Sequence, residues 1–94
     1  MKKYELMLII NPELKDADRT SLLEEVKKEL ENLSAKVIKE DLIGTKTLAY
    51  KISGSSSGYY VLYELESNKP FDNLMKFFNI KKDVWRNLLV KIED

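Results

Sequence analysis

The chain has 94 residues, a length that suits a single domain, residues 1–94, with one hydrophobic core. It contains neither cysteine nor histidine, which excludes disulfides and thiolate nucleophiles and removes the commonest general base and metal ligand. With 16 basic and 16 acidic residues the formal net charge is zero, so no overall field attracts a polyanion from a distance. We therefore expect no enzyme, no metal and no cofactor.

The first segment predicts a strand over residues 3–10. Apolar and polar residues alternate and then give way to an apolar run, which Asn11-Pro12 ends because proline has no amide hydrogen for a sheet. Residues 6–10 are too few for the core of a signal peptide, and no apolar run reaches the roughly 20 residues of a membrane-spanning helix. We expect a cytoplasmic protein without membrane contact.

The next segment predicts an amphipathic helix with a charged outer face. Asp16 and Asp18 are candidates for its N-cap, and Ser21 with Glu24 also fits a capping box. The apolar stripe consists of Leu22, Leu23, Val26, Leu30 and Leu33.

A long strand follows over residues 35–52, with a bulge expected at Gly44. The segment Gly54–Gly58 holds three serines between two glycines and predicts a flexible turn, because glycine allows positive φ and none of these residues is apolar. Residues 59–65 are aromatic and β-favouring and predict the third strand. The basic and aromatic arms of this hairpin indicate a binding surface more than a catalytic pocket.

The last third of the chain predicts a short helix and a final strand. Asn68-Lys69-Pro70 is typical of a helix start, since proline is tolerated in the first turn. A turn at residues 80–83 leads to a strand over residues 84–92, where Trp85 and Leu89 leave the face assignment open. The helix stripe is Phe71, Leu74, Met75 and Phe78, and the even strand positions are Val84, Leu88, Val90 and Ile92.

The order βαββαβ predicts an α+β, ferredoxin-like sandwich: a four-stranded antiparallel sheet with two helices on one face. On the first and third strands, the alternate residues that start at Tyr4 and Tyr59 include no acidic one, so we assign them to the helices. The opposite face is left open and has an apolar centre, which is typical of a partner interface. The predicted interface residues are Met7, Ile9, Tyr60 and Leu62, with Glu5 and Glu64 beside them.

Several short motifs are spread along the whole chain: Tyr4-Glu5, Asn11-Pro12, the Gly-x-Lys-x-Leu-Ala-Tyr-x-Ile pattern of Gly44–Ile52, Gly58-Tyr59-Tyr60 and Val84-Trp85-Arg86. With these motifs the chain resembles the family of bacterial small ribosomal subunit protein six, over essentially its whole length. The resemblance implies a ferredoxin-like, non-catalytic protein that binds the central domain of the 16S ribosomal RNA as a heterodimer with small-subunit protein eighteen.

Basic and aromatic side chains near the two ends are candidates for RNA binding. Lys2 and Lys3 could reach phosphates while Tyr4 stacks on a sugar or base; the alternative is a solvated terminus with Tyr4 in the core. Arg86 has a planar guanidinium that suits bidentate phosphate binding, and a surface salt bridge to Asp83 is its alternative.

The hairpin supplies three further RNA-binding candidates, Lys46, Tyr50 and Lys51. Their alternative role is that of edge-strand residues, where lysines resist aggregation. The chain departs from the family pattern here: Thr47 stands where a second charged or polar residue, often arginine, commonly follows Lys46, and Lys51 stands where proline is frequent. The number of basic residues in the hairpin is about preserved.

Two other functions are compatible with this fold. A small phosphatase would need a glycine-rich phosphate loop with an arginine, and the Gly54–Gly58 loop holds no basic residue. A ligand-sensing regulatory dimer would pair its sheets and bind a small molecule between them; the basic hairpin argues against this alternative.

Overall fold

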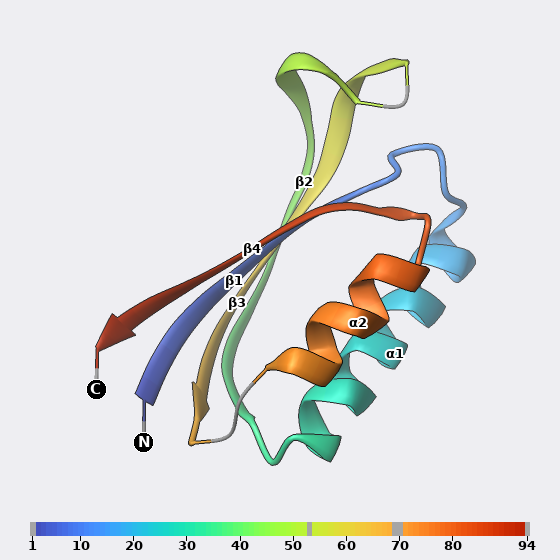
Figure 1. Cartoon of the computed structure of the whole chain (residues 1–94). Coiled ribbons are helices and arrows are strands. Elements are labelled where there is room, and N and C mark those ends of the chain that lie inside the picture. The colour runs from blue at the N-terminus through green and yellow to red at the C-terminus, as the bar shows by residue number, and fades with distance from the viewer. Residues whose placement is uncertain (1, 53, 69–70, 94) are drawn as a thin grey trace.

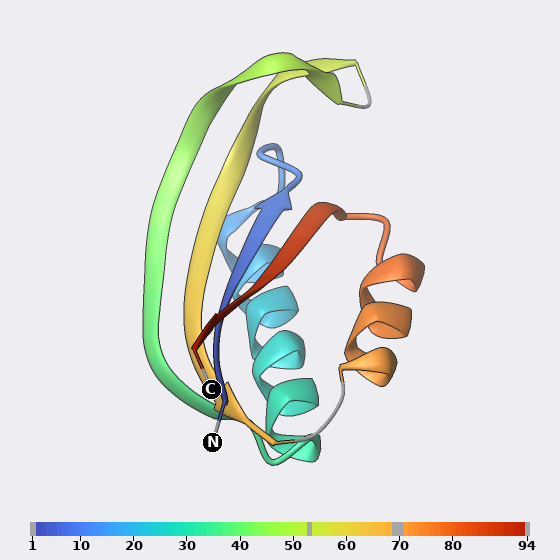
Figure 2. The same cartoon turned by 60° about the vertical axis from the view of Figure 1, so that its left-hand side comes forward.

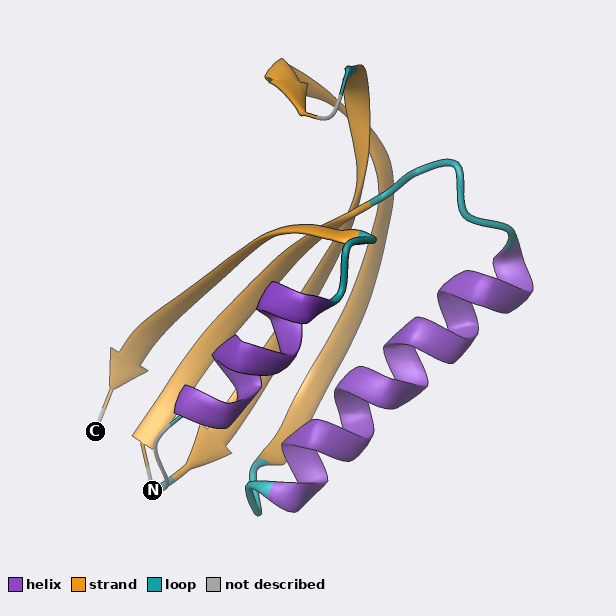
Figure 3. Ribbon diagram, turned by 45° about the vertical axis from the view of Figure 1, so that its right-hand side comes forward, coloured by secondary structure: helices purple, strands orange, loops and turns teal. Residues whose placement is uncertain are grey.

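The computed structural model describes residues 2–52, 54–68 and 71–93. It confirms the predicted order and the ferredoxin-like fold: a four-stranded antiparallel sheet in the order β2-β3-β1-β4, with both helices on one face (Figures 1 and 3). No helix in this described part is long and apolar enough to cross a membrane. The elements are β1 (Lys2–Ile10), α1 (Asp16–Asn32), β2 (Lys36–Ile52), β3 (Ser55–Ser67), α2 (Asp72–Ile80) and β4 (Val84–Glu93).

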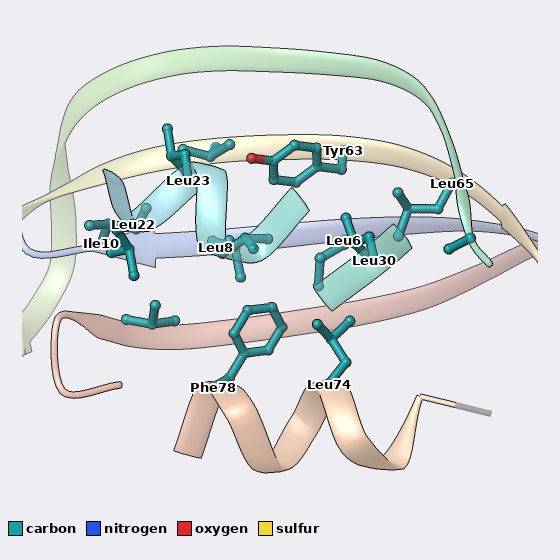
Figure 4. Packing of buried hydrophobic residues seen from close by; sticks show 14 of the residues in the cluster. Leu6, Leu8, Ile10, Leu22, Leu23, Leu30, Tyr63, Leu65, Leu74 and Phe78 are labelled. Carbon is teal, nitrogen blue, oxygen red and sulfur yellow. The ribbon is translucent and has the colours of Figure 1, made fainter. Parts of the chain in front are cut away.

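The core lies between the two helices and the two central strands, β1 and β3. Alternate residues of these strands are fully buried, as the predicted alternation requires: Leu6, Leu8, Ile10, Val61, Tyr63 and Leu65. Each large apolar side chain buried in this way contributes about 1.5–3 kcal/mol. Figure 4 shows the helix residues that point at them, among them Leu22, Leu23, Leu30, Leu74 and Phe78.

The predicted caps of the first helix are wrong. Lys15 is the N-cap residue, with extended backbone angles and no side-chain hydrogen bond to the helix. Asp16 instead accepts a hydrogen bond from Arg19 Nη2 at 2.6 Å, and Asp18 also lies in the first turn. Acidic residues in the first turn stabilise a helix through its dipole. Asp16 and Asp18 therefore stabilise α1 by their charge and not as N-cap residues.

The hairpin of β2 and β3 is longer than predicted, and the turn assigned to Gly54–Gly58 is wrong. Strand β3 already begins at Ser55, and Ser57 and Gly58 pair with Thr47 and Lys46 of β2. Only Gly54, at φ 81°, needs the positive angle expected of a turn glycine. The predicted bulge at Gly44 is confirmed by a register shift between Leu42 and Gly44.

The helix-start motif at residues 68–70 lies partly outside the described residues, because residues 69 and 70 are not described. Phe71 is the N-cap residue of α2, and its side chain accepts no hydrogen bond from the first turn. The predicted apolar stripe is confirmed: Phe71, Leu74 and Phe78 are buried, and Met75 is half-buried against the core.

A bulge decides the faces of β4, which the sequence left open. Val84 pairs with Ile10, whereas Arg86 pairs with Ile9, so Trp85 is the extra residue. Beyond the bulge the alternation is reversed, and Leu89 packs against the core. The even positions Leu88, Val90 and Ile92 are therefore 53, 46 and 50 % exposed, while Val84 is buried.

A buried polar pair lies on the core side of β2 and β3. The Tyr63 hydroxyl and Glu40 Oε2 are both buried without a hydrogen-bond partner, while Glu40 Oε1 lies 3.0 Å from Lys27 Nζ. Burial, and then the nearby Glu40 carboxylate, raises the pKa of Tyr63 far above its usual value. Both effects favour the protonated form of the phenol in the folded protein.

Replacing Tyr63 with phenylalanine should leave stability unchanged or raise it by up to about 1 kcal/mol, because a buried hydroxyl without a partner only costs desolvation energy. Urea denaturation of both proteins measures the difference. The control is Tyr63→Leu, which removes the ring as well and should destabilise. A loss above about 1 kcal/mol in Tyr63→Phe would mean that the hydroxyl does donate a hydrogen bond, for which Glu40 is the acceptor at hand.

Candidate nucleic-acid and partner interface

The sheet face opposite the helices carries the four predicted interface residues side by side. Met7 pairs with Leu62 and Ile9 pairs with Tyr60 across the two central strands. All four side chains are half-buried, and no helix covers this face in Figures 1 and 3. The structure thus brings together the residues that the sequence assigned to a partner.

The edge strand β4 extends this apolar surface. Leu88 lies beside Met7, and Val90 lies beside Glu5. The sequence-based prediction of the interface missed Leu88 and Val90, because the bulge at Trp85 reverses the alternation of β4. The available sign of this bulge was the large apolar Trp85 directly after the apolar Val84, which interrupts the alternation. The open-face patch, as we call it, consists of Met7, Ile9, Tyr60, Leu62, Leu88 and Val90. A contiguous exposed apolar surface of this kind is typical of a protein-binding site.

The two ends of the open-face patch differ in their charges. At one end Glu5 and Glu64 lie directly opposite each other, and Lys39 pairs with Glu64. At the other end Arg86 pairs with Ile9, and Lys46 pairs with Gly58 just beyond Tyr60. The second end is basic and suits a phosphate backbone, whereas charges of both signs meet at the first end.

The distal part of the β2–β3 hairpin, residues 44–52 and 54–58, projects beyond the ends of β1 and β4 (Figure 2). We call it the hairpin arm. Lys46 and Lys51 are exposed on it, and Tyr50 is 67 % exposed, so all three hairpin candidates can be reached by a ligand. These side chains suit phosphate contacts and base stacking.

Contacts within the hairpin arm order its described residues near the tip, on either side of residue 53. Ile52 is buried, and the Ser55 hydroxyl donates to Ser57 O at 3.0 Å and accepts from Ser57 N at 3.2 Å. The tip and the start of β4 line a hollow of about 650 Å³, which includes residues 54–56, Asp83 and Trp85. The arm therefore curves toward the end of the sheet where Arg86 lies.

Arg86 is exposed at the start of β4. Its Nη1 donates to Trp85 O at 2.8 Å, which uses one of the five guanidinium N–H groups. Asp83 Oδ1 instead accepts from Asn11 Nδ2 at 3.3 Å. Among the described residues, the alternative salt bridge between Arg86 and Asp83 is therefore not formed, and the guanidinium keeps donors for an anion.

The N-terminal candidates lie away from the other RNA-binding candidates. Lys2 and Lys3 are exposed at the far end of β1, a strand about 26 Å long at the usual rise per residue (Figure 1). Tyr4 is half-buried and meets the ring of Phe71 edge-on at 4.8 Å between centroids. This geometry favours the packing role of Tyr4 over stacking on RNA, and leaves the two lysines as a separate basic group.

The structure describes no group of three or more histidine, cysteine, aspartate or glutamate side chains that could hold a metal ion, within the described residues. The candidate site consists of an apolar face, a basic arm and exposed charges, a combination that suits the binding of large partners.

Comparisons with known proteins agree along the full chain. The family described as Ribosomal protein S6 matches residues 3–91. The protein named Small ribosomal subunit protein bS6 from Shouchella clausii is 35 % identical over 94 residues, covering 99 % of each chain. The protein of the same name from Fusobacterium nucleatum is 37 % identical over 93 residues, covering 97 % of this chain and 98 % of that one.

Solved structures show the same relationship. The crystal structure of 30S ribosomal protein S6 from Thermotoga maritima matches with a TM-score of 0.90 and 26 % identity, over 97 % of this chain and 87 % of that one. A chain of the Thermotoga maritima complex of the chemotaxis kinase CheA P2 domain with CheY matches at 0.66, over 97 and 98 %, but at 13 % identity it shares the fold alone. The chain therefore belongs to the ribosomal protein S6 family, and it is a non-enzymatic protein of the small ribosomal subunit in the cytoplasm.

Proposed function

We propose that the protein binds the central domain of the 16S ribosomal RNA as a heterodimer with small-subunit protein eighteen. The observation that carries this proposal is the junction of two surfaces: the uncovered apolar patch ends where the basic residues begin, at Ile9 beside Arg86. The partner covers the patch, and the RNA contacts the hairpin arm and Arg86 next to it.

The number of basic contacts explains why a partner is needed. Lys46, Lys51 and Arg86 neutralise about three phosphates, which gives a salt slope of only about −2 to −3 and weak binding. The net charge of zero adds no long-range attraction. A partner on the open-face patch supplies the missing contacts and joins its RNA-binding surface to this one.

The proposal is tested by filter binding of a central-domain 16S fragment at two salt concentrations, with and without small-subunit protein eighteen. We expect tight, salt-sensitive binding only when both proteins are present. Equally tight binding by this protein alone would contradict the need for a partner. Absence of specific binding in both cases would overturn the proposal and favour the regulatory dimer, which sedimentation of the protein alone would then reveal.

Arg86→Ala and Lys46→Ala should each weaken RNA binding by the protein pair about fivefold and lower the salt slope by about one, because each removes one phosphate contact. The same filter assay measures both quantities. Lys28→Ala is the matched control, since Lys28 is exposed on α1 behind the sheet. If Lys28→Ala has the same effect as the other two, the contacts are unspecific charge effects.

A further inference from the structure

We propose that Ile9 is a positioning residue that fixes the direction of the hairpin arm relative to Arg86 and the open-face patch. The inference rests on the proposed function for its consequence in RNA binding. Its structural part, the hold of Ile9 on the arm, concerns the protein alone.

The contact between Ile9 and the hairpin arm is close. A Cβ atom built at Gly58 would lie 2.5 Å from Ile9 Cγ2 and 3.3 Å from Leu48 Cδ2. The β3 backbone at Gly58 therefore runs directly against the Ile9 methyl group, with Leu48 of the opposite arm strand beside it. This is the place where the hairpin leaves the main sheet, since β1 ends at Ile10.

The same side chain borders the other parts of the candidate site. Ile9 pairs with Tyr60 on one side and with Arg86 on the other. It is also half-buried on the face that we assign to the partner. The Ile9 side chain thus contacts the base of the hairpin arm, lies beside Arg86 and belongs to the face that we assign to the partner.

The branch of the isoleucine, more than its volume, makes the contact. Cγ2 is bonded to Cβ, and β-branched side chains are stiff at χ1, so the methyl position is fixed by the β1 backbone. A partner that covers the open-face patch presses on Ile9 and restricts it further. The arm, with Lys46, Tyr50 and Lys51, is thereby held in one direction when the partner is bound.

Two conservative variants separate the methyl contact from side-chain volume. Ile9→Val keeps both branches at Cβ and loses only the terminal carbon, whereas Ile9→Leu keeps the size and loses the branch. Met7→Leu is the matched control, two residues away on the same face. All three changes are conservative at half-buried positions, so the fold should persist.

Hydrogen exchange of the isolated protein is the first readout. In Ile9→Leu, the hydrogen-bonded amides of residues 45–48 and 55–58 should exchange about fivefold faster or more, while Ile9→Val and Met7→Leu exchange like the wild type. The amides of β1 and α1 report on global stability and should not change in any of them. Equal exchange in Ile9→Leu and wild type, or equal acceleration in all three variants, would overturn the inference.

RNA binding by the protein pair is the second readout. With partner affinity measured separately, Ile9→Leu should weaken the RNA affinity of the formed pair about fivefold, whereas Ile9→Val should keep the RNA affinity of the wild type. A loss of partner affinity that accounts for the whole effect would mean that Ile9 is only an interface residue. If the wild-type pair fails to bind the RNA, the proposed function fails, and hydrogen exchange alone decides whether Ile9 positions the arm.

Discussion

Replacing Leu62 with glutamate should weaken binding of small-subunit protein eighteen at least about thirtyfold, which corresponds to about 2 kcal/mol, while the protein stays folded. Leu62 lies in the open-face patch on β3, between Met7 of β1 and Asp41 of β2. In the complex a glutamate there would be removed from water without a partner, and would add to the negative charge of Asp41. Isothermal titration calorimetry with purified protein eighteen measures the loss.

The control for this variant is Ile80→Glu, which makes the same kind of change at a different surface. Ile80 is 79 % exposed at the end of α2, on the helix side of the sheet. The Ile80→Glu variant should bind the partner like the wild type. Thermal unfolding of both variants confirms that they are folded. Wild-type affinity in Leu62→Glu would show that the partner does not occupy the open-face patch.

The central strands could be predicted closely because their pattern is local and regular. The alternation that starts at Tyr4 and at Tyr59 correctly assigned the residues of β1 and β3 to the two faces of the sheet. In a strand that is buried on one side, every second residue faces the core. The shared face of the predicted interface residues Met7, Ile9, Tyr60 and Leu62 followed from the same alternation. They lie together as predicted because strands adjacent in the sheet share a face.

The edge strands could be predicted less well because bulges change their alternation. An extra residue, Trp85, turns Leu88 and Val90 to the open face, and unlike the bulge at Gly44 it is marked by no glycine in the sequence. The serine-rich segment was misread for a related reason. Its composition is typical of a turn, but pairing with β2 forms the strand from Ser55 onward, and tertiary context outweighs local preference.

The separation of the RNA-binding candidates into two groups follows from the antiparallel sheet that the sequence predicts, but their exact neighbours do not. Lys2 and Lys3 lie at one end of β1, and Arg86 lies at the other because β4 is antiparallel to β1 and shifted by a bulge. The packing of Tyr4 against Phe71 joins residues far apart in the chain. Distances of this kind depend on register, which composition and spacing leave undetermined.

Gly58→Ala should destabilise the protein by about 1–3 kcal/mol, a fall of roughly 10 °C in Tm, because the new Cβ would lie 2.5 Å from Ile9 Cγ2. The sign of the change in stability distinguishes two roles of Gly58. If Gly58 were a turn glycine with ordinary backbone angles and open space around it, alanine would stabilise the protein by about 0.4–1 kcal/mol, because it lowers the entropy of the unfolded chain. Thermal and urea unfolding measure the change.

A double-mutant cycle tests whether the contact between the new Cβ at position 58 and Ile9 causes the loss of stability. Ile9→Ala removes the methyl group that the new Cβ would meet, so the double variant Gly58→Ala, Ile9→Ala should be more stable than the sum of the single changes by about 1 kcal/mol or more. Ser57→Ala, at the neighbouring position of the same strand, is the control and should show no coupling to Ile9→Ala. Additive losses would place the strain of Gly58→Ala elsewhere, at Leu48 on the opposite side of the arm. A positive coupling confined to Ile9 would show that close approach to β1 is what requires glycine at position 58.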